Sequence, residues 1–142
     1  EKNLCPCLPP VLGNRGHFIQ VLVNLLDNAV QSLISLSKTE KVVLLSTQAK
    51  GGGVVLEVSD NGPGIKDEIK DDIFKPFFTT KGGRGNTGMG LAIVNYLVKK
   101  YNGKISVHKG PLGGASFCLE FPACPYGLFV TGADKIEDSA GR

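Results

Sequence analysis

The chain has 142 residues, of which 42% are hydrophobic and 20% are charged, and this is the composition of one ordinary globular domain. Its formal net charge of +3 is too small to indicate a nucleic-acid partner. No apolar run approaches the roughly 20 residues of a membrane-spanning helix, so we expect a soluble domain without membrane contact, in the cytoplasm even where the full-length protein is membrane-anchored.

The first half of the chain predicts one long helix followed by a hairpin. Residues 17–36 repeat apolar side chains at the three- and four-residue spacing of an amphipathic helix. Residues 41–49 and 54–60 are rich in β-branched side chains and are separated by KGGG, which predicts two strands joined by a tight turn. DNGPGI then ends the second strand, and residues 66–73 predict a short charged helix.

The second half repeats this order. After a glycine-rich loop, residues 91–101 keep helical spacing until Asn102 and Gly103 end the helix. The segments 104–108 and 115–121 flank KGPLGG and predict a second hairpin. This order of elements is typical of an α+β domain, a two-layer sandwich with one sheet covered on one face by helices. We assign residues 1–122 to this domain and residues 123–142 to a loosely ordered C-terminal tail.

A stripe of amides runs along the first helix. Gln20, Asn24, Asn28 and Gln31 follow one another at steps of four, four and three residues, so they share one face. A solvated face is the simpler interpretation, but such a face usually carries Lys, Glu or Arg. Amide oxygens can instead complete the coordination of Mg²⁺ when phosphates and water supply the other ligands.

An acidic residue ends the strand 54–60. Strand alternation places Asp60 on the apolar side of the strand, where a carboxylate needs a hydrogen-bond donor. DNG alone could be only a hairpin turn. The amine of adenine would be a suitable donor, and Gly62 and Gly64 would let a flat ring lie against the backbone.

The glycine-rich loop precedes the second helix. Asn86 or Thr87 can cap that helix, which leaves Gly88 and Gly90 in a first turn whose free N–H groups attract anions. Lys81 and Arg84 add positive charge upstream. A flexible surface loop is the alternative, and the sequence lacks the GK[ST] of a P-loop.

Four segments in this order resemble the N, G1, F and G2 boxes of sensor histidine kinase ATP-binding domains. They are NLLDNA, DNGPGI, IFKPFFTTK and GNTGMGLAIV, and the resemblance extends from Leu8 to Pro122. The PFFTTK segment is similar to nitrogen-regulation and PAS-linked kinases. The wider superfamily includes gyrase, Hsp90-type chaperones and MutL, and its Bergerat fold is a mixed, mostly antiparallel sheet under helices.

The resemblance implies roles for individual residues. Asn28 would ligate Mg²⁺, with Asn24 beside it, and Asp60 would hydrogen-bond the adenine amine. Thr80 and Lys81 would lie near the phosphates, so Asn24, Asn28 and Lys81 are the expected catalytic residues. The base of the ATP lid would be held by Phe74, Pro76 and Phe77. The other residues expected to contact ATP are Gly62, Gly64, Ile65, Phe77, Thr87, Gly88, Gly90 and Leu91.

The sequence also departs from the pattern of many sensor kinases. Gln31 and Ser32 stand where a lysine and an aromatic residue often follow the N box. His17 and His108 are the only histidines, and neither lies in an acceptor pattern. We therefore expect a protein-histidine kinase domain whose phosphate goes to a histidine on a separate dimerisation domain, and then to a response regulator. The four cysteines match no disulfide or zinc spacing, so we expect free thiols.

Two alternatives remain at this stage. An ATP-hydrolysing clamp of the gyrase or chaperone type would need a glutamate in the place of Asn24, to activate water. A non-catalytic ATP-sensing module would carry the same boxes, because it too must bind the nucleotide.

Overall fold

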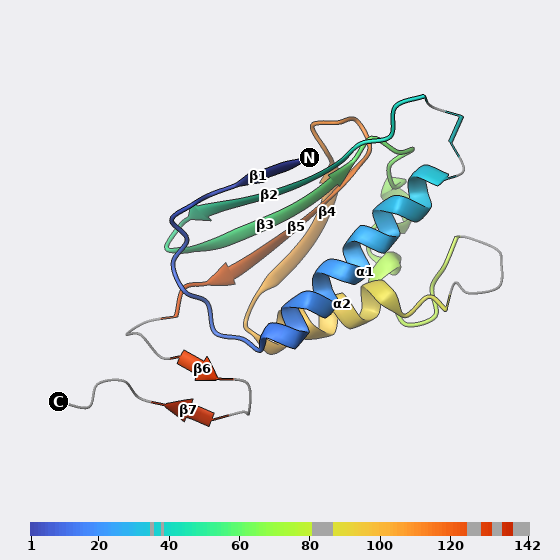
Figure 1. The fold of residues 1–142 in the computed structure, drawn as a ribbon. Helices are drawn as coiled ribbons and strands as arrows, with labels where there is room; N and C mark the ends of the chain where they lie inside the picture. The colour runs from blue at the N-terminus through green and yellow to red at the C-terminus, as the bar shows by residue number, and fades with distance from the viewer. Residues whose placement is uncertain (35, 38, 81–86, 125–128, 132–134, 138–142) are drawn as a thin grey trace.

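The computed structural model describes residues 1–142 except 35, 38, 81–86, 125–128, 132–134 and 138–142 (Figure 1). A five-stranded sheet in the order β1-β2-β3-β5-β4 carries two helices on the same side. The elements of this domain are β1 (Lys2–Leu4), α1 (Arg15–Ile34), β2 (Val43–Lys50), β3 (Gly53–Asp60), the 3₁₀ turns η1 (Asp67–Ile69) and η2 (Asp72–Phe74), α2 (Gly90–Lys100), β4 (Lys104–Lys109) and β5 (Ala115–Pro122).

Both predicted hairpins form, which confirms the α+β sandwich. β2 pairs antiparallel with β3, and Gly51 and Gly52 turn the chain between them with φ of 58° and 75°. β4 pairs antiparallel with β5, and β5 also pairs with β3. The sheet is mixed because β1, which the sequence pattern did not predict, pairs parallel with β2. Three residues are too few for alternation to reveal a strand.

The core lies between the helices and one face of the sheet. Helix α1 contributes a buried row at the spacing predicted from the sequence, and α2 contributes a second row. The sheet side is closed by large side chains that are almost fully buried, Phe117 and Leu119 among them. The buried helical residues are Val21, Leu25, Ala29, Leu33, Val94, Leu97 and Val98. This packing holds the two helices against one face of the sheet.

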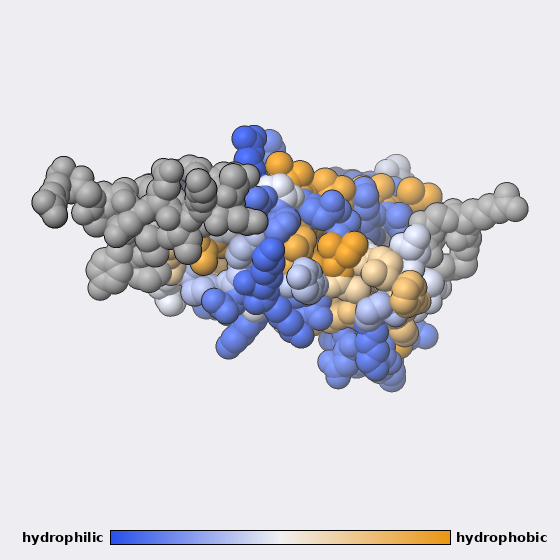
Figure 2. Space-filling model, turned by 90° about the horizontal axis from the view of Figure 1, so that it is seen from below, coloured by the Kyte–Doolittle hydropathy of each residue, from blue (hydrophilic) through white to orange (hydrophobic). Residues whose placement is uncertain are grey.

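The outer face of α1 is partly apolar. Ile19, Val23, Val30 and Ile34 are 45–69% exposed, and helical spacing places them along one side of the helix. On the face seen from below, hydrophobic side chains lie among hydrophilic ones (Figure 2). In this domain the fully buried side chains of α1 are therefore those of the row that faces the sheet.

Two local predictions were wrong. In place of one helix over residues 66–73, the chain forms the 3₁₀ turns Asp67–Ile69 and Asp72–Phe74. A segment this short is marginal as a helix, and the carboxylates of Asp71 and Asp72 near its C-terminal end oppose the helix dipole. Helix α2 begins at Gly90 with Met89 as the N-cap residue and no side-chain cap. Thr87 therefore lies too early to cap it, while Asn86 lies outside the described residues.

Backbone pairing continues just past Pro122. The N–H of Ala123 donates to the carbonyl of Gly52, at 3.2 Å, and the N–H of Cys124 donates to the carbonyl of Pro10, at 2.7 Å. Farther on, β6 (Phe129–Thr131) and β7 (Lys135–Glu137) pair antiparallel with each other. The division at residue 122 stays a prediction.

Candidate functional site

A cleft of about 740 Å³ lies beside α1 and the start of α2. Its volume is within the range of roughly 300–1,000 Å³ that small-molecule sites occupy. Asn28, Asp60 and Gly88, one residue from each of the three sequence constellations, all line it. The predicted residues that line this cleft are Asn24, Asn28, Asp60, Gly64, Ile65, Thr80, Thr87, Gly88, Gly90 and Leu91. Segments far apart in the sequence thus meet at one cavity.

Asp60 is held in a fixed orientation at one end of the cleft. It ends β3 and is only 2% exposed. Its Oδ1 accepts hydrogen bonds from the N–H groups of Gly62, at 2.8 Å, and Ala115, at 3.3 Å. Within the described part of the chain, no group donates to Oδ2. The carboxylate therefore offers one oriented oxygen to a donor in the cleft.

The glycines around Asp60 make room for that carboxylate. A Cβ at Gly62 would lie 2.7 Å from Asp60 Oδ1 and 2.9 Å from Ser32 Oγ, and a Cβ at Gly114 would lie 2.3 Å from Asp60 Oδ1. Gly62 is not among the residues that line the cleft, whereas Gly64 lines it with a φ of 77°. The atoms that pack closely against Gly62 are thus those of Asp60 and Ser32. The sequence predicts an adenine ring against the Gly62 backbone, and this packing takes the place of that contact.

The amide stripe of α1 is only partly directed at the cleft. Asn24, Asn28 and Gln31 line it, and Gln20 does not. The Nδ2 of Asn24 donates to the carbonyl of Gly90, at 3.2 Å, and its Oδ1 accepts from Gln20 Nε2, at 3.1 Å. Asn24 therefore ties α1 to the first residue of α2.

The glycine-rich end of the cleft is also shaped by protein contacts. Gly88 has a φ of 67°, and a Cβ there would lie 2.6–2.9 Å from backbone atoms of Phe77. The N–H of Phe77 donates to the carbonyl of Gly88, at 3.0 Å. At Gly90 the nearest atom to an added Cβ is Asn24 Cγ, at 3.9 Å. Gly88 lies before the helix, so only Gly90 occupies the predicted first turn. Lys81 and Arg84 lie outside the described residues.

Phe77 does not contact the cleft as predicted. It has a φ of 64°, its side chain is 77% exposed, and it is not a lining residue. Phe78 lines the cleft in its place. The sequence alone does not show which of two adjacent phenylalanines faces the cleft. The left-handed backbone conformation at Phe77 decides that Phe78 faces inward. Phe74 packs edge-on against Phe117 in the core, with ring centroids 6.4 Å apart.

Sequence reasoning also missed several lining residues. Asp27 adds a carboxylate next to Asn28, and Ser32 lies near Asp60 and Gly62. The side chains of Ile69 and Ile73 contribute apolar surface. Asp27 could have been found from its place beside Asn28 in the helix, whereas the isoleucines carry no sequence signal apart from being apolar.

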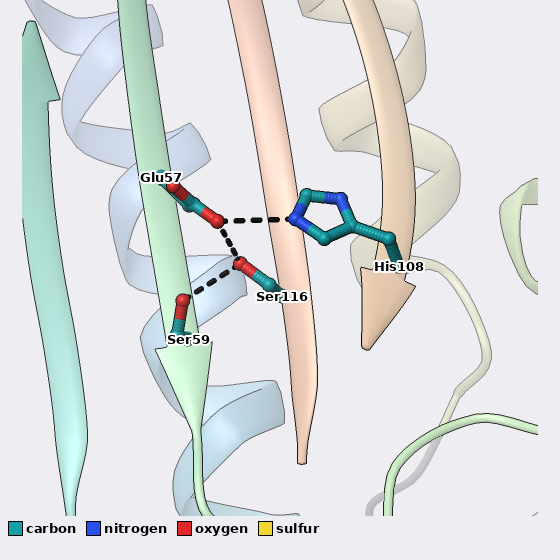
Figure 3. A network of polar contacts seen from close by, with 4 residues as sticks. All are labelled: Glu57, Ser59, His108 and Ser116. Carbon is teal, nitrogen blue, oxygen red and sulfur yellow. Dashed lines mark hydrogen bonds and ion pairs between the residues drawn. The ribbon is translucent and has the colours of Figure 1, made fainter. Parts of the chain in front are cut away.

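Both histidines lie outside the cleft. The Nδ1 of His17 is hydrogen-bonded to the hydroxyl of Tyr101. The Nε2 of His108 lies 3.2 Å from Glu57, which also accepts a hydrogen bond from Ser116 (Figure 3). This network joins β3, β4 and β5 on the face of the sheet opposite the helices, because Glu57 alternates with the core residue Val58. These contacts of the two histidines are thus with residues outside the cleft.

Cys5, Cys7 and Cys118 are free thiols in this structure, as expected. Partial burial, followed by the nearby carboxylates of Glu57 and Glu120, raises the pKa of Cys118 above its usual value.

The described residues contain no group of three or more His, Cys, Asp or Glu side chains that could hold a metal ion by themselves. Over the same residues, no helix is long and apolar enough to cross a membrane.

The geometry agrees with a known protein family. Residues 13–125 match the family model described as Histidine kinase-, DNA gyrase B-, and HSP90-like ATPase. The chain belongs to this ATPase family. The recognition of its boxes in the sequence is thereby confirmed, as is the fold class.

Relatives of this ATPase domain are sensor histidine kinases. The C4-dicarboxylate transport sensor protein DctB of Rhizobium meliloti is 39% identical over 75% of this chain and 17% of its own length. The sensory histidine kinase/phosphatase NtrB of Rhodobacter capsulatus is 38% identical over 84% of the chain and 36% of its own length. Among solved structures, full-length ShkA in complex with AMPPNP is 34% identical, with a TM-score of 0.69, and the match covers 85% of this chain and 24% of that one.

The chain thus spans about a sixth to a third of the length of these curated relatives. It corresponds to their catalytic ATP-binding domain.

Proposed function

We propose that this domain binds Mg²⁺-ATP and donates the γ-phosphate to a histidine on a separate dimerisation domain, as part of a protein-histidine kinase. The observation that carries the proposal is the common cleft, which joins an oriented carboxylate, an amide-bearing helix face and the glycine-rich start of α2. From the phosphohistidine, the phosphoryl group would pass to a response regulator. The relatives described as sensor histidine kinases support this assignment.

Asp60 would recognise the adenine base. Its Oδ1 is occupied by two backbone N–H groups, which leaves Oδ2 to accept a hydrogen bond from the exocyclic amine of adenine. Gly64, Ile65 and Phe78 would surround the ring with backbone and apolar surface. A hydrogen bond to a charged carboxylate in a buried site contributes both affinity and a preference for adenine over bases that lack a donor at that position.

The phosphates would lie toward the start of α2. Thr87, Gly88 and Gly90 line the cleft there, and the first N–H groups of a helix favour anions. Thr80 and Lys81 remain candidates for phosphate contacts from the upstream side. The hydrogen bond from Asn24 to Gly90 would hold this helix start in place while the phosphates bind.

The donor set of the cleft fits Mg²⁺ when a nucleotide is present. Asn28 supplies an amide oxygen and Asp27 a carboxylate on the lining of the same cleft, and both are hard oxygen ligands. Too few protein carboxylates gather to form a protein-only site within the described chain, so the remaining ligands would come from phosphate and water. When bound, Mg²⁺ would neutralise charge on the phosphate oxygens.

Phosphoryl transfer would need little chemistry from the domain itself. Such reactions depend mainly on positioning and on charge stabilisation, and an imidazole is a competent nucleophile. Asn24 lacks a basic group and is engaged by Gly90 and Gln20, so activation of water at this position is disfavoured. The isolated chain should therefore bind ATP and turn it over slowly.

A phosphotransfer assay tests this proposal. The chain is mixed with radiolabelled ATP, Mg²⁺ and the dimerisation domain of a sensor kinase, with its acceptor histidine present or replaced by glutamine. The expected product is an acid-labile, base-stable phosphate that appears only with the histidine. Tight ATP binding without this product would indicate a nucleotide-sensing module, and rapid hydrolysis without an acceptor would indicate a clamp ATPase.

A further inference from the structure

A second cavity of about 490 Å³ lies next to the nucleotide cleft. Residues 63–66 line both cavities, so this short segment forms a wall between them. The other walls come from Asp67 and Lys70, from the end of β4 and from the turn between β4 and β5. Its volume is that of a small-molecule site.

The charges around this second cavity are mostly positive. Lys66, Lys70 and Lys109 line it, with Asp67 as the single carboxylate among the described lining residues. Asp67 is paired with Lys70 at 2.5 Å, and its side chain is 87% exposed, so it points largely to solvent. The side chains of Lys66 and Lys109 form no ion pair or hydrogen bond with any described residue. His108 also lines the cavity, but its Nε2 is directed to Glu57.

The turn between β4 and β5 leaves the cavity open at Gly113, which is exposed. Gly113 has a φ of 90°, and an added Cβ there would meet nothing within 4 Å. The N–H groups of Gly113 and Gly114 are already bonded to the carbonyls of Gly110 and Asp60, so they do not attract anions themselves. The lysine ammonium groups are the charged donors of the cavity, and they suit a ligand with two or more negative groups.

The second cavity is connected to Asp60. Gly114 lines the cavity, donates its N–H to the carbonyl of Asp60 at 3.1 Å, and packs against Asp60 Oδ1. A ligand that shifts the turn around Gly114 or the wall at 63–66 would therefore change the position of the group expected to bind adenine. This gives a physical link between the two cavities.

We propose that the second cavity is an effector site for small polyanions, molecules with two or more carboxylate or phosphate groups, and that its occupancy changes nucleotide affinity. Binding at the site is independent of the function proposed above, whereas the coupling rests on it. Lys109 is the residue of choice for a test because it lines the second cavity and not the nucleotide cleft.

Citrate is a suitable probe. The chain is titrated with citrate in magnesium-free buffer at constant ionic strength, and backbone amides are followed by NMR. We expect saturable shifts centred on Lys109, Gly113 and Gly114. Lys109→Ala loses one charge contact and should weaken citrate binding about threefold to fivefold. Lys109→Arg should restore the affinity for citrate. Lys99→Ala removes an exposed lysine at the end of α2 and should leave the affinity unchanged. Shifts centred on Gly88 and Gly90, shifts that do not saturate, or equal losses in both alanine variants would overturn the site.

Coupling is tested separately by calorimetry. The dissociation constant of ADP is measured with and without saturating citrate at a fixed free Mg²⁺ concentration. A change of at least about twofold that disappears in Lys109→Ala supports the coupling. An unchanged constant refutes the coupling alone, while failure of ADP to bind at all would refute the proposed function and leave the citrate result standing.

Discussion

Replacement of Asp60 by asparagine tests adenine recognition with little change in shape. The amide oxygen of the variant can still accept from Gly62 and Ala115, as Oδ1 does in the native chain. The amide NH₂ would then face the cleft, where it would meet the adenine amine donor to donor. The unliganded Asp60→Asn domain should therefore stay folded, and its nucleotide affinity should fall.

The size of this loss follows from the hydrogen bond removed. A hydrogen bond to a charged group contributes about 1.5–3 kcal/mol, or roughly a 12- to 160-fold change in dissociation constant. ADP at 100 times its dissociation constant stabilises the native state by about 2.7 kcal/mol, and this would fall to about 0.3–1.3 kcal/mol in Asp60→Asn. At roughly 2–4 °C per kcal/mol, the Tm shift on adding ADP would decrease from about 5–11 °C to about 1–5 °C.

The assay is a thermal melt with and without ADP and Mg²⁺. Asp71→Asn is the matched control, because it removes an exposed carboxylate that does not line the cleft. It should keep the full ligand-induced shift. If Asp60→Asn is stabilised by ADP as much as the native chain, Asp60 does not bind the base and the orientation of the nucleotide inferred here is wrong.

Three further predictions concern other residues. Asn28→Ala should weaken ADP binding about tenfold with Mg²⁺ and little with EDTA, as measured by calorimetry, because a metal ligand is lost; equal losses in both buffers would contradict this role. Gly88→Ala should lower the free energy of unfolding, measured by urea denaturation, by about 2–4 kcal/mol, because the strain of a positive φ adds to a clash with the Phe77 backbone. Gly52 also has a positive φ but open space around it, so Gly52→Ala should lower the free energy of unfolding by only about 1 kcal/mol. Because its raised pKa leaves less thiolate at pH 7–8, Cys118 should react with iodoacetamide more slowly than the exposed Cys7; faster labelling of Cys118 would contradict the burial that raises its pKa.

Periodicity and turn residues predicted the main elements of the fold because each is a local signal. The inner row of α1 and the two hairpins follow from spacing within one segment. Strand β1 was missed, since three residues gain their structure only by pairing with β2, more than 40 residues away. The charged segment 66–73 was read as one helix because its propensity is helical, while its length and its acidic end favour short turns.

The cleft was predicted from polar residues, a carboxylate and amides, at positions where a packed core would carry apolar side chains or a solvated face would carry other charges. Asp60 at the end of an apolar strand and Asn28 on an amide stripe both line the cavity, as expected. The reason for each glycine was harder to predict. Gly62 excludes a side chain because Asp60 and Ser32 pack against it, and Gly88 because the backbone of Phe77 does. The contacts with Ser32 and Phe77 join different segments of the fold and leave no trace in the spacing of the sequence.

The hydrogen bond between Phe77 and Gly88 brings the two ends of one segment of the chain together. A 3.0 Å hydrogen bond and close backbone packing join these two residues, so the segment between them starts and ends at nearly the same point. When two positions of a chain are joined in this way, doubling the number of residues between them costs only about 0.6 kcal/mol in closure entropy. Insertions or deletions between residues 79 and 87 should therefore change the free energy of unfolding of the sandwich little, which makes this segment a place where related kinases can differ in sequence at little cost to folding.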